Sequence, residues 1–307
     1  MPAYNSAAYI AESILSVQNQ TYKYWELIVV DDGSIDSTVE IVKSIIESDN
    51  RIIYLYQKNS KQAAARNNGT RLAKGEWIAF LDSDDIWINT KLQVQYEVIR
   101  QHNPDVVYSA GSYLYENGST EHYTTKTGIF QGVDFFRILY GENHIPILSV
   151  VVKKNIIDNI GLQNENRFFQ GCEDWDLLLR IAKTNSIFIG LPDQLFFYRK
   201  HSQGTSANSI KMRLSQALVL LNNFDLKVFE DRYYFMRLKP LIDSIALTLI
   251  QNGKISEAHY LYHQALKHPK KGWFKINLLI LNIMGRYSFL SIRIWNKIVS
   301  VFLKMSF

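Results

Sequence analysis

The chain has 307 residues, of which 47% are hydrophobic and 21% are charged, and it contains one cysteine. This composition excludes a disordered or collagen-like chain, and one cysteine excludes a disulfide framework or a cysteine-rich zinc site. No run of about 18 apolar residues occurs, so no transmembrane helix is predicted. The first residues contain no basic and apolar leader, so we expect a cytoplasmic protein.

The charge is unevenly distributed along the chain. The net charge is +5, yet no acidic residue follows Glu257, and the segment after it holds eight lysine and arginine residues. A nucleic-acid-binding protein would more often be basic over its main folded face, so we expect no nucleic-acid partner. A basic tail rich in tryptophan, phenylalanine, leucine and isoleucine suits an anionic membrane surface. The alternative is a helical subdomain or a docking surface for a partner.

The hydrophobic patterns predict helices and strands in alternation. In chain order the first predicted elements are a helix at 6–19, a strand at 26–30, a helix at 36–46, a strand at 51–56, a helix at 62–73, a strand at 77–81 and a helix at 91–101. This order is typical of an α/β fold in which helices cover a mostly parallel, Rossmann-like sheet. Later predicted elements are strands at 106–115, 147–152 and 188–198 and a helix at 173–183.

From about residue 207 the pattern is helical to the end of the chain. We therefore expect a catalytic domain over residues 1–205 and a helical, basic C-terminal extension over residues 206–307.

Acidic residues follow the predicted strands where ligands bind in parallel α/β sheets. Asp82, Ser83 and Asp84 come directly after the apolar run 78–81. Carboxylates at positions i and i+2 of an extended chain lie on the same side and suit a divalent cation that substrate phosphates also hold. A solvated surface turn is the alternative for this tripeptide on its own. Neither a dinucleotide-binding glycine motif nor a P-loop occurs.

Several segments, taken together, resemble family 2 glycosyltransferases, which are inverting enzymes of the GT-A fold. They occur in the family's order and spacing over about residues 1–205, whereas residues 206–307 carry no family signature. The matching segments are Pro-Ala-Tyr-Asn at 2–5, residues 12–22, residues 26–34, Ala-Arg-Asn at 65–67, residues 75–85, Glu-Asp-Trp-Asp at 173–176 and Tyr-Arg-Lys-His at 198–201.

The resemblance implies a site for a nucleotide-sugar donor. Pro2 and Tyr4 match positions that line the base and ribose. Asp31 matches the carboxylate that reads the nucleobase, commonly uracil. Arg66 matches a basic position that approaches the nucleotide. A UDP-sugar is therefore the expected donor.

The resemblance also implies a metal site. Asp82, Ser83 and Asp84 match the D-x-D element, with Asp84 expected to contact the metal and Asp82 to lie nearer the ribose. His201 matches a position that approaches the metal or the diphosphate. The implied cofactor is Mg²⁺ or Mn²⁺, which would stabilise the departing diphosphate. From spacing alone, His201 is an ordinary histidine at the end of a strand.

Asp174 matches the family's general base, which takes a proton from the acceptor hydroxyl. Glu173 is expected to orient Asp174 or the acceptor. From spacing alone, both residues are acids that favour a helix N-terminus. Trp175 either walls the acceptor site or packs in the core.

The resemblance implies an inverting hexosyltransferase that moves a sugar to a saccharide or lipid-linked acceptor. The basic tail would suit peripheral contact of such an enzyme with the cytoplasmic face of the membrane. The chain departs from the family at two positions. Only Met1 precedes Pro2, where the family has an apolar strand, so we expect either an upstream start codon or an impaired protein. Lys61 stands where the family often has glycine. A catalytically impaired protein that binds a nucleotide or a partner is the alternative function.

Overall fold

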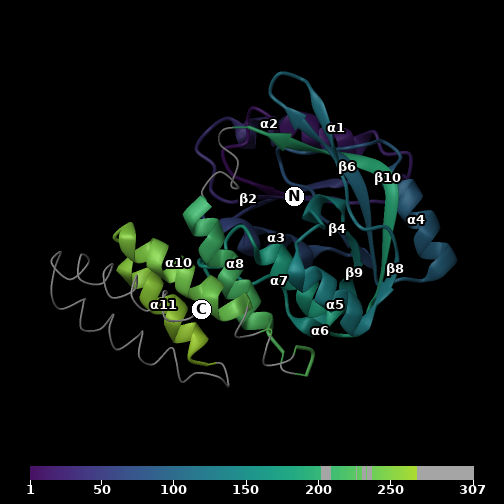
Figure 1. The fold of residues 1–307 in the computed structure, drawn as a ribbon. Helices are drawn as coiled ribbons and strands as arrows, with labels where there is room; N and C mark the ends of the chain where they lie inside the picture. The colour runs from purple at the N-terminus through teal and green to yellow at the C-terminus, as the bar shows by residue number, and fades with distance from the viewer. Residues whose placement is uncertain (202–208, 226, 230–232, 234–236, 268–307) are drawn as a thin grey trace, which may run out of the picture. The chain divides into compact units, whose positions relative to one another are not determined.

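The computed structural model describes residues 1–201, 209–225, 227–229, 233 and 237–267 (Figure 1). Contacts within the chain define two compact units, residues 1–207 and residues 208–307. The basic tail after residue 267, for which we expect membrane contact, lies outside the described residues. Within the part of the chain that is described, no helix is both long and apolar enough to cross a bilayer.

The first sheet of unit 1 has three parallel strands in the order β1-β2-β3. All residues of β2 are buried, which is the continuous apolar run expected of a parallel strand covered on both faces. The alanine-rich helix α3 packs closely on this strand, with Ala65 against Ile28 and Val30. The elements are β1 (Pro2–Ala3), α1 (Ile10–Gln18), β2 (Leu27–Asp31), α2 (Thr38–Ile46), β3 (Ile52–Tyr56) and α3 (Lys61–Leu72).

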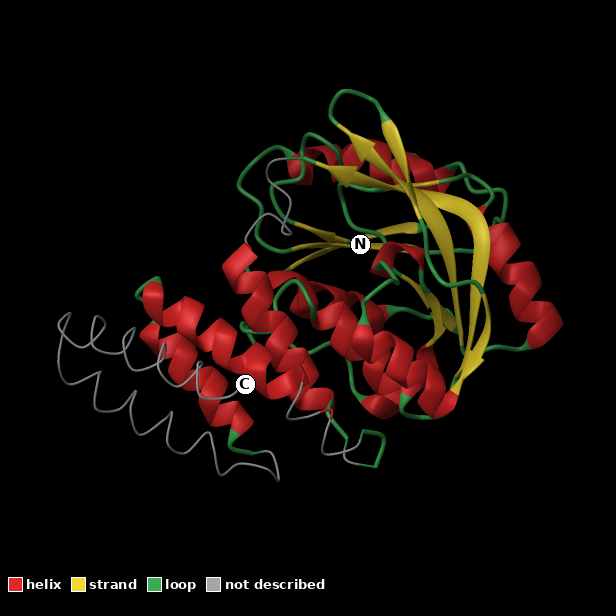
Figure 2. Ribbon diagram, in the orientation of Figure 1, coloured by secondary structure: helices red, strands yellow, loops and turns green. Residues whose placement is uncertain are grey.

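The second sheet has the strand order β4-β9-β6-β10-β5, with β7 beside β6 and β8 beside β10. Only β6 and β10 pair in parallel; the other pairs are antiparallel. The prediction of an α/β fold with parallel strands is confirmed, but the sequence did not indicate that the strands form two sheets (Figure 2). The strands are β4 (Trp77–Ala79), β5 (Ile86–Trp87), β6 (Val106–Tyr115), β7 (Thr120–Tyr123), β8 (Gly128–Gln131), β9 (Val151–Lys153) and β10 (Ile187–Lys200).

The remaining helices of unit 1 are α4 (Lys91–His102), α5 (Gly132–Gly141), the short 3₁₀ helix η1 (Ile147–Ser149), α6 (Lys154–Ile160) and α7 (Glu173–Ala182). The strand predicted at 147–152 begins late, because η1 follows Pro146 and β9 starts only at Val151. The sequence analysis did not predict β5, β7, β8, α5 or α6.

The described part of unit 2 is mainly helical. Its helices are α8 (Ser209–Asn223), α10 (Lys239–Gln251) and α11 (Ile255–Ala265). Helix α10 packs against α8 and α11. Ile242 and Ile245 of α10 and Leu261 of α11 are among its buried residues.

Candidate active site

The first group of site residues lies where β2 ends. Asp31 is fully buried, and its two carboxylate oxygens accept hydrogen bonds from the Ser34 amide at 2.9 Å and the Tyr54 hydroxyl at 2.8 Å. The chain turns sharply at Gly33, whose φ is +81° and where a Cβ atom would lie 3.1 Å from the Asn59 nitrogen. Glycine is therefore needed for this turn. Tyr54 was missed in the sequence, although it lies on β3 beside β2.

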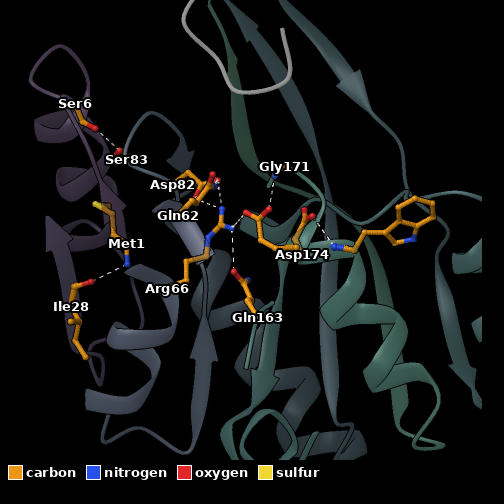
Figure 3. A network of polar contacts seen from close by, with 12 residues as sticks. Met1, Ser6, Ile28, Gln62, Arg66, Asp82, Ser83, Gln163, Gly171 and Asp174 are labelled. Atoms are coloured by element: carbon orange, nitrogen blue, oxygen red, sulfur yellow. Dashed lines mark hydrogen bonds and ion pairs between the residues drawn. The ribbon is translucent and has the colours of Figure 1, made fainter. Parts of the chain in front are cut away.

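The loop after β1 connects this turn to the acidic loop after β4. Pro2 is buried in β1, and Tyr4 is 49% exposed. The Asn5 amide donates to the Ser34 hydroxyl at 3.0 Å. The next residue, Ser6, has its hydroxyl 2.7 Å from that of Ser83 (Figure 3). The segments expected to bind the base and the diphosphate are thus joined by side-chain hydrogen bonds.

Arg66 of α3 lies at the centre of the polar network (Figure 3). One terminal nitrogen donates to both carboxylate oxygens of Asp82, at 2.6 and 2.9 Å. The other donates to Glu173 at 3.0 Å and to Gln163 at 3.5 Å. Arg66 is 5% exposed, so these charges interact in a poorly solvated environment. Burial lowers the pKa of Arg66, but Asp82 and Glu173 outweigh it and raise the pKa overall.

The pair Glu173 and Asp174 opens helix α7. The Gly171 amide donates to the second oxygen of Glu173 at 2.6 Å, which fixes this buried carboxylate between Gly171 and Arg66. The Trp175 amide donates to Asp174 at 2.7 Å. Burial, followed by the Glu173 charge, raises the pKa of Asp174 from 3.8 to about 7, and Arg66 opposes this change. A carboxyl with this pKa is suited to accept a proton near neutral pH.

Trp175 belongs to the core. It is 6% exposed, and its indole nitrogen donates to the Leu139 carbonyl at 2.8 Å. Of the two alternatives left open by the sequence, packing in the core is therefore the one observed.

Asp84 lies beside His201, which follows the end of β10. The His201 Nε2 atom is 2.9 Å from an Asp84 oxygen. Burial, followed by the Asp82 charge, raises the pKa of Asp84, and His201 opposes this change. Asp82 instead bonds to Arg66. Within the described ranges, no three histidine, cysteine, aspartate or glutamate side chains surround one point.

Asp84 and His201 nevertheless fit a divalent cation of the expected kind. One carboxylate oxygen and one imidazole nitrogen are donors for Mn²⁺ or Mg²⁺, and both ions commonly take their remaining ligands from water and substrate phosphates. Two protein ligands are therefore enough for a cation that binds together with the sugar-donor substrate.

The loop before α7 is held to α3 by residues that the sequence analysis did not single out. The Asn67 side chain donates to the Gln163 carbonyl at 2.9 Å and accepts from the Gln163 amide at 2.9 Å. Its amide group also donates to Glu165 at 2.8 Å. These bonds place the Glu173 loop beside Arg66. Asn67 belongs to the segment 65–67 that matches the family, so its position could have been noticed. No pattern in the sequence indicated a role for Gln163.

Asp32, next to Asp31, has a structural role. It accepts hydrogen bonds from the Gln57 side chain at 2.7 Å and from the amides of Ser60 and Lys61 at 2.7 and 2.9 Å. Lys61, where the resemblance leads us to expect glycine, has a φ of +75° in the left-handed region. The loop thus keeps a glycine-like backbone despite the lysine side chain.

Comparison with known proteins places this site in a family context. The family model described as "Glycosyl transferase family 2" matches residues 1–157. An uncharacterized glycosyltransferase of Haemophilus influenzae is 31% identical over 244 residues, which cover 77% of this chain and 92% of that protein. The Escherichia coli protein WfgD, named as a UDP-Glc:alpha-D-GlcNAc-diphosphoundecaprenol beta-1,3-glucosyltransferase, is 36% identical over 188 residues, covering 61% and 70%. Three matching Rickettsia proteins are longer, and the chain spans 36% to 44% of their length.

Solved structures share the fold. Staphylococcus aureus TarS 1-349 in complex with UDP-GlcNAc has a TM-score of 0.61 at 20% identity, covering 86% of this chain and 79% of that chain. The mannosyltransferase PcManGT of Pyrobaculum calidifontis, in complex with GDP-Man and Mn²⁺, has a TM-score of 0.54 at 18% identity, covering 96% and 81%. At these identities the likeness supports the fold and leaves the substrates open.

Proposed function

The chain belongs to glycosyl transferase family 2, and we propose that it transfers a sugar with inversion from a nucleoside diphosphate donor to a hydroxyl of a saccharide or lipid-linked acceptor. The observation that carries this proposal is the position of Arg66. Its guanidinium bonds to Asp82 in the loop expected to bind the donor and to Glu173 beside the candidate base. A donor site and a proton acceptor are thereby held in one network.

The donor proposal rests on the loops after β1, β2 and β4. Pro2, Tyr4 and Asp31 would hold the nucleoside, and a buried carboxylate such as Asp31 can accept the imide N–H of uracil. Uracil is favoured because a structural neighbour was solved with UDP-GlcNAc and WfgD is named for UDP-Glc. Asp82 and Ser83 would lie near the ribose.

The transfer step needs a base on the acceptor side. The acceptor oxygen attacks the anomeric carbon while the bond from that carbon to the diphosphate oxygen breaks, and Asp174 receives the proton of the acceptor hydroxyl. The nucleoside diphosphate leaves with the bonding electron pair. Glu173, fixed by Arg66 and Gly171, orients this end of α7.

Asp84 and His201 would hold a Mg²⁺ or Mn²⁺ ion, which when bound neutralises charge on the diphosphate leaving group. The Mn²⁺ complex of a structural neighbour supports the use of a divalent cation. Asp82 is a weaker candidate ligand, because Arg66 already occupies both of its oxygens.

For the acceptor we propose only a chemical class. WfgD is named for a substrate linked to diphosphoundecaprenol, which supports a lipid-linked acceptor in polysaccharide or glycolipid synthesis. Such an acceptor would bring the enzyme to the cytoplasmic face of the membrane, where the basic tail would contact anionic lipid.

The test is release of nucleoside diphosphate from a panel of UDP- and GDP-sugars by the full chain, with Mn²⁺, with Mg²⁺ and with a chelator. We expect metal-dependent release for one donor, at a rate lowered by Asp174→Asn. The matched control is Asp193→Asn, because Asp193 is an exposed carboxylate on β10.

Nucleotide binding without release or transfer, even in the presence of candidate lipid-linked acceptors, would contradict the proposal. It would favour the alternative, a catalytically impaired protein that binds a nucleotide or a partner.

A further inference from the structure

One face of the second sheet carries a row of tyrosines. Strand β6 pairs with both β10 and β7, so that Tyr113 lies opposite Tyr198 of β10 and Gly111 lies opposite Tyr123 of β7. Paired residues share a face of the sheet, as do residues two positions apart on one strand. We call this surface the tyrosine face; its side chains are Tyr113, Tyr115, Tyr123, Phe196, Tyr198 and Lys200.

Tyr113 lies at the centre of the tyrosine face. Its ring centroid is 5.2 Å from that of Tyr123, 5.8 Å from that of Tyr198 and 6.4 Å from that of Tyr115. The Lys200 ammonium lies 4.6 Å from the Tyr113 ring centroid and 4.4 Å from that of Tyr198. Aromatic pairs and cation–π contacts at these distances are attractive, so the side chains hold one another in place.

The tyrosine face rests on the core of unit 1. Phe196 is 1% exposed, and its ring centroid is 5.9 Å from that of Tyr123. A Cβ atom on Gly111 would lie 2.5 Å from the Phe196 ring, so only glycine leaves room for this ring at position 111. Tyr123 and Tyr198 pack against a buried cluster that includes Leu81, the residue directly before Asp82. The rings are thus supported from below and lie next to the candidate site.

The two sides of β10 serve different parts of that site. The Arg199 Nε atom donates to the Asp84 carbonyl at 2.8 Å, and the His201 Nε2 atom is 2.9 Å from the Asp84 carboxylate. Tyr198 and Lys200 alternate with these residues along the strand and therefore belong to the other side. The side that carries the tyrosine face is thus not the side that contacts the expected metal ligand Asp84.

Tyr123 connects the tyrosine face to the candidate base. Burial raises the pKa of the Tyr123 hydroxyl, and the Asp174 carboxylate is among the charges that raise it further. A carboxylate has this effect on a phenol that lies near it. A ligand held on the tyrosine face would therefore have Asp174 beside it.

Polar groups on the tyrosine face are available to a ligand. Within the described part of the chain, the hydroxyls of Tyr113 and Tyr123 form no hydrogen bond, and the Lys200 ammonium forms no ion pair. Tyr115 is 36% exposed, and Tyr113, Tyr123 and Lys200 are half-buried. A hollow of about 460 Å³ adjoins this surface, lined by Tyr115, Glu116, Asn117, Lys200 and His201.

A sugar ring matches this combination of groups. A pyranose has apolar C–H bonds on its faces and hydroxyl groups around its rim, so an aromatic ring can pack on a face while polar side chains bond to the rim. Cross-strand aromatic pairs can also serve only to stabilise a hairpin. That role alone would need neither an unpaired lysine nor half-buried hydroxyls without partners.

We propose that the tyrosine face is the subsite for a pyranose ring of the acceptor, with Tyr113 and Tyr123 packed against its C–H face and Lys200 donating to its oxygen atoms. That the bound saccharide is the acceptor rests on the proposed function. In this arrangement the attacking hydroxyl of the saccharide lies beside Asp174, while the donor diphosphate lies on the Asp84 side of β10.

The test is NMR titration of the full chain, with ¹³C-labelled tyrosine, with the methyl glycosides of glucose, N-acetylglucosamine, galactose and mannose. UDP and Mg²⁺ are present throughout, so that the nucleotide site is occupied. We expect at least one glycoside to shift the ring signals of Tyr113 and Tyr123 in a saturable manner. If none of the four glycosides shifts these signals, the proposal is overturned.

Variants separate binding from folding. Tyr113→Leu should weaken glycoside binding by about fivefold or more, whereas Tyr113→Phe, which keeps the ring, should change it by less than about twofold. Lys200→Met leaves the rings in place and should weaken binding by about threefold. The matched control is Tyr24→Leu, because Tyr24 is 87% exposed and lies outside the tyrosine face. Unchanged glycoside affinity in Tyr113→Leu and Lys200→Met would refute the subsite, and Lys200→Met alone decides if Tyr113→Leu fails to fold.

The same samples distinguish this proposal from the proposed function. Glycoside binding that depends on Tyr113, in a chain that releases no nucleoside diphosphate from any donor, would support a saccharide site and contradict the transferase. Donor-dependent release together with glycoside binding that is indifferent to Tyr113 and Lys200 would support the transferase and overturn the subsite. UDP affinity should stay within about twofold in all variants.

Discussion

Replacing Asp174 by asparagine keeps the size of the side chain and the oxygen that accepts the Trp175 amide, but removes the ability to take a proton. We expect the transfer rate to fall by about 10²- to 10⁴-fold, the usual contribution of a positioned base. Donor affinity should change less than about twofold, because the donor would be held by Asp31, Asp84 and the loop after β1. Transfer rates and donor affinities are measured on the same protein samples.

The raised pKa of Asp174 gives this prediction a pH dependence. Its value of about 7 means that the candidate base is largely protonated at pH 6, so the transfer rate of the unmodified chain should rise with pH, reach half its maximum near pH 7 and level off near pH 8. The asparagine variant should not show this rise. A plateau reached already at pH 5 would refute the assignment of a buried, high-pKa base.

The same pKa predicts an effect on stability. Because the folded pKa lies above the unfolded value of 3.8, ionisation of Asp174 lowers the free energy of unfolding as the pH rises from about 4 through 7. A pKa raised by about three units corresponds to a loss of at most about 4 kcal/mol in the free energy of unfolding. We expect about 2 kcal/mol, because the carboxyl is only half-buried. Asp174→Asn should therefore gain about 2 kcal/mol over the unmodified chain at pH 8 and little at pH 4.

Denaturant unfolding at both pH values measures this difference, with Asp193→Asn as the exposed control. Glu173→Gln tests which member of the pair is the base, and it should cost less transfer activity than Asp174→Asn. If Glu173→Gln abolishes transfer while Asp174→Asn does not, the base has been assigned to the wrong residue.

Four further outcomes are expected. Arg66→Met should lower the free energy of unfolding by about 3–5 kcal/mol, since it leaves buried carboxylates unpaired, and adding Glu173→Gln should restore part of this loss in denaturant unfolding. Asp84→Asn should weaken Mn²⁺-dependent donor binding by at least about tenfold in calorimetry, and an unchanged affinity would make Asp84 a turn residue only. Lys61→Gly should raise the free energy of unfolding by up to about 1 kcal/mol by relieving its positive φ, whereas Lys58→Gly, the matched control, should not. Deleting residues 270–307 should reduce sedimentation with anionic vesicles at low salt, and equal sedimentation of both proteins would contradict the expected membrane contact.

Elements that carry residues of the candidate site could be predicted because their signals are local. The strand expected at 26–30 is observed at Leu27–Asp31, and the helix expected at 173–183 at Glu173–Ala182. Helix α5 also had a usable signal, since Phe135, Phe136, Leu139 and Tyr140 are buried at helical spacing. By contrast, all but one residue of β8 are exposed, so this strand has no buried face that a hydrophobic pattern could have indicated.

The centre of the site could not be predicted, because its contacts join distant parts of the chain. Arg66 and Glu173 are 107 positions apart, and Arg66 and Gln163 are 97 apart. Residue types in the sequence indicated that each would be polar or charged. They gave no reason to pair Arg66 with Asp82 and Glu173 rather than with a phosphate.

The sharing of Arg66 between Asp82 and Glu173 has a consequence for engineering the donor preference. A library that varies position 82 to admit other sugars also changes how strongly Arg66 holds Glu173, and with it the proton affinity of Asp174. Substitutions at position 82 that widen the range of accepted sugar donors should therefore also shift the pH optimum of the transfer reaction. A library that varies position 82 should therefore also vary Arg66 or Glu173, so that compensating substitutions can be selected together with it.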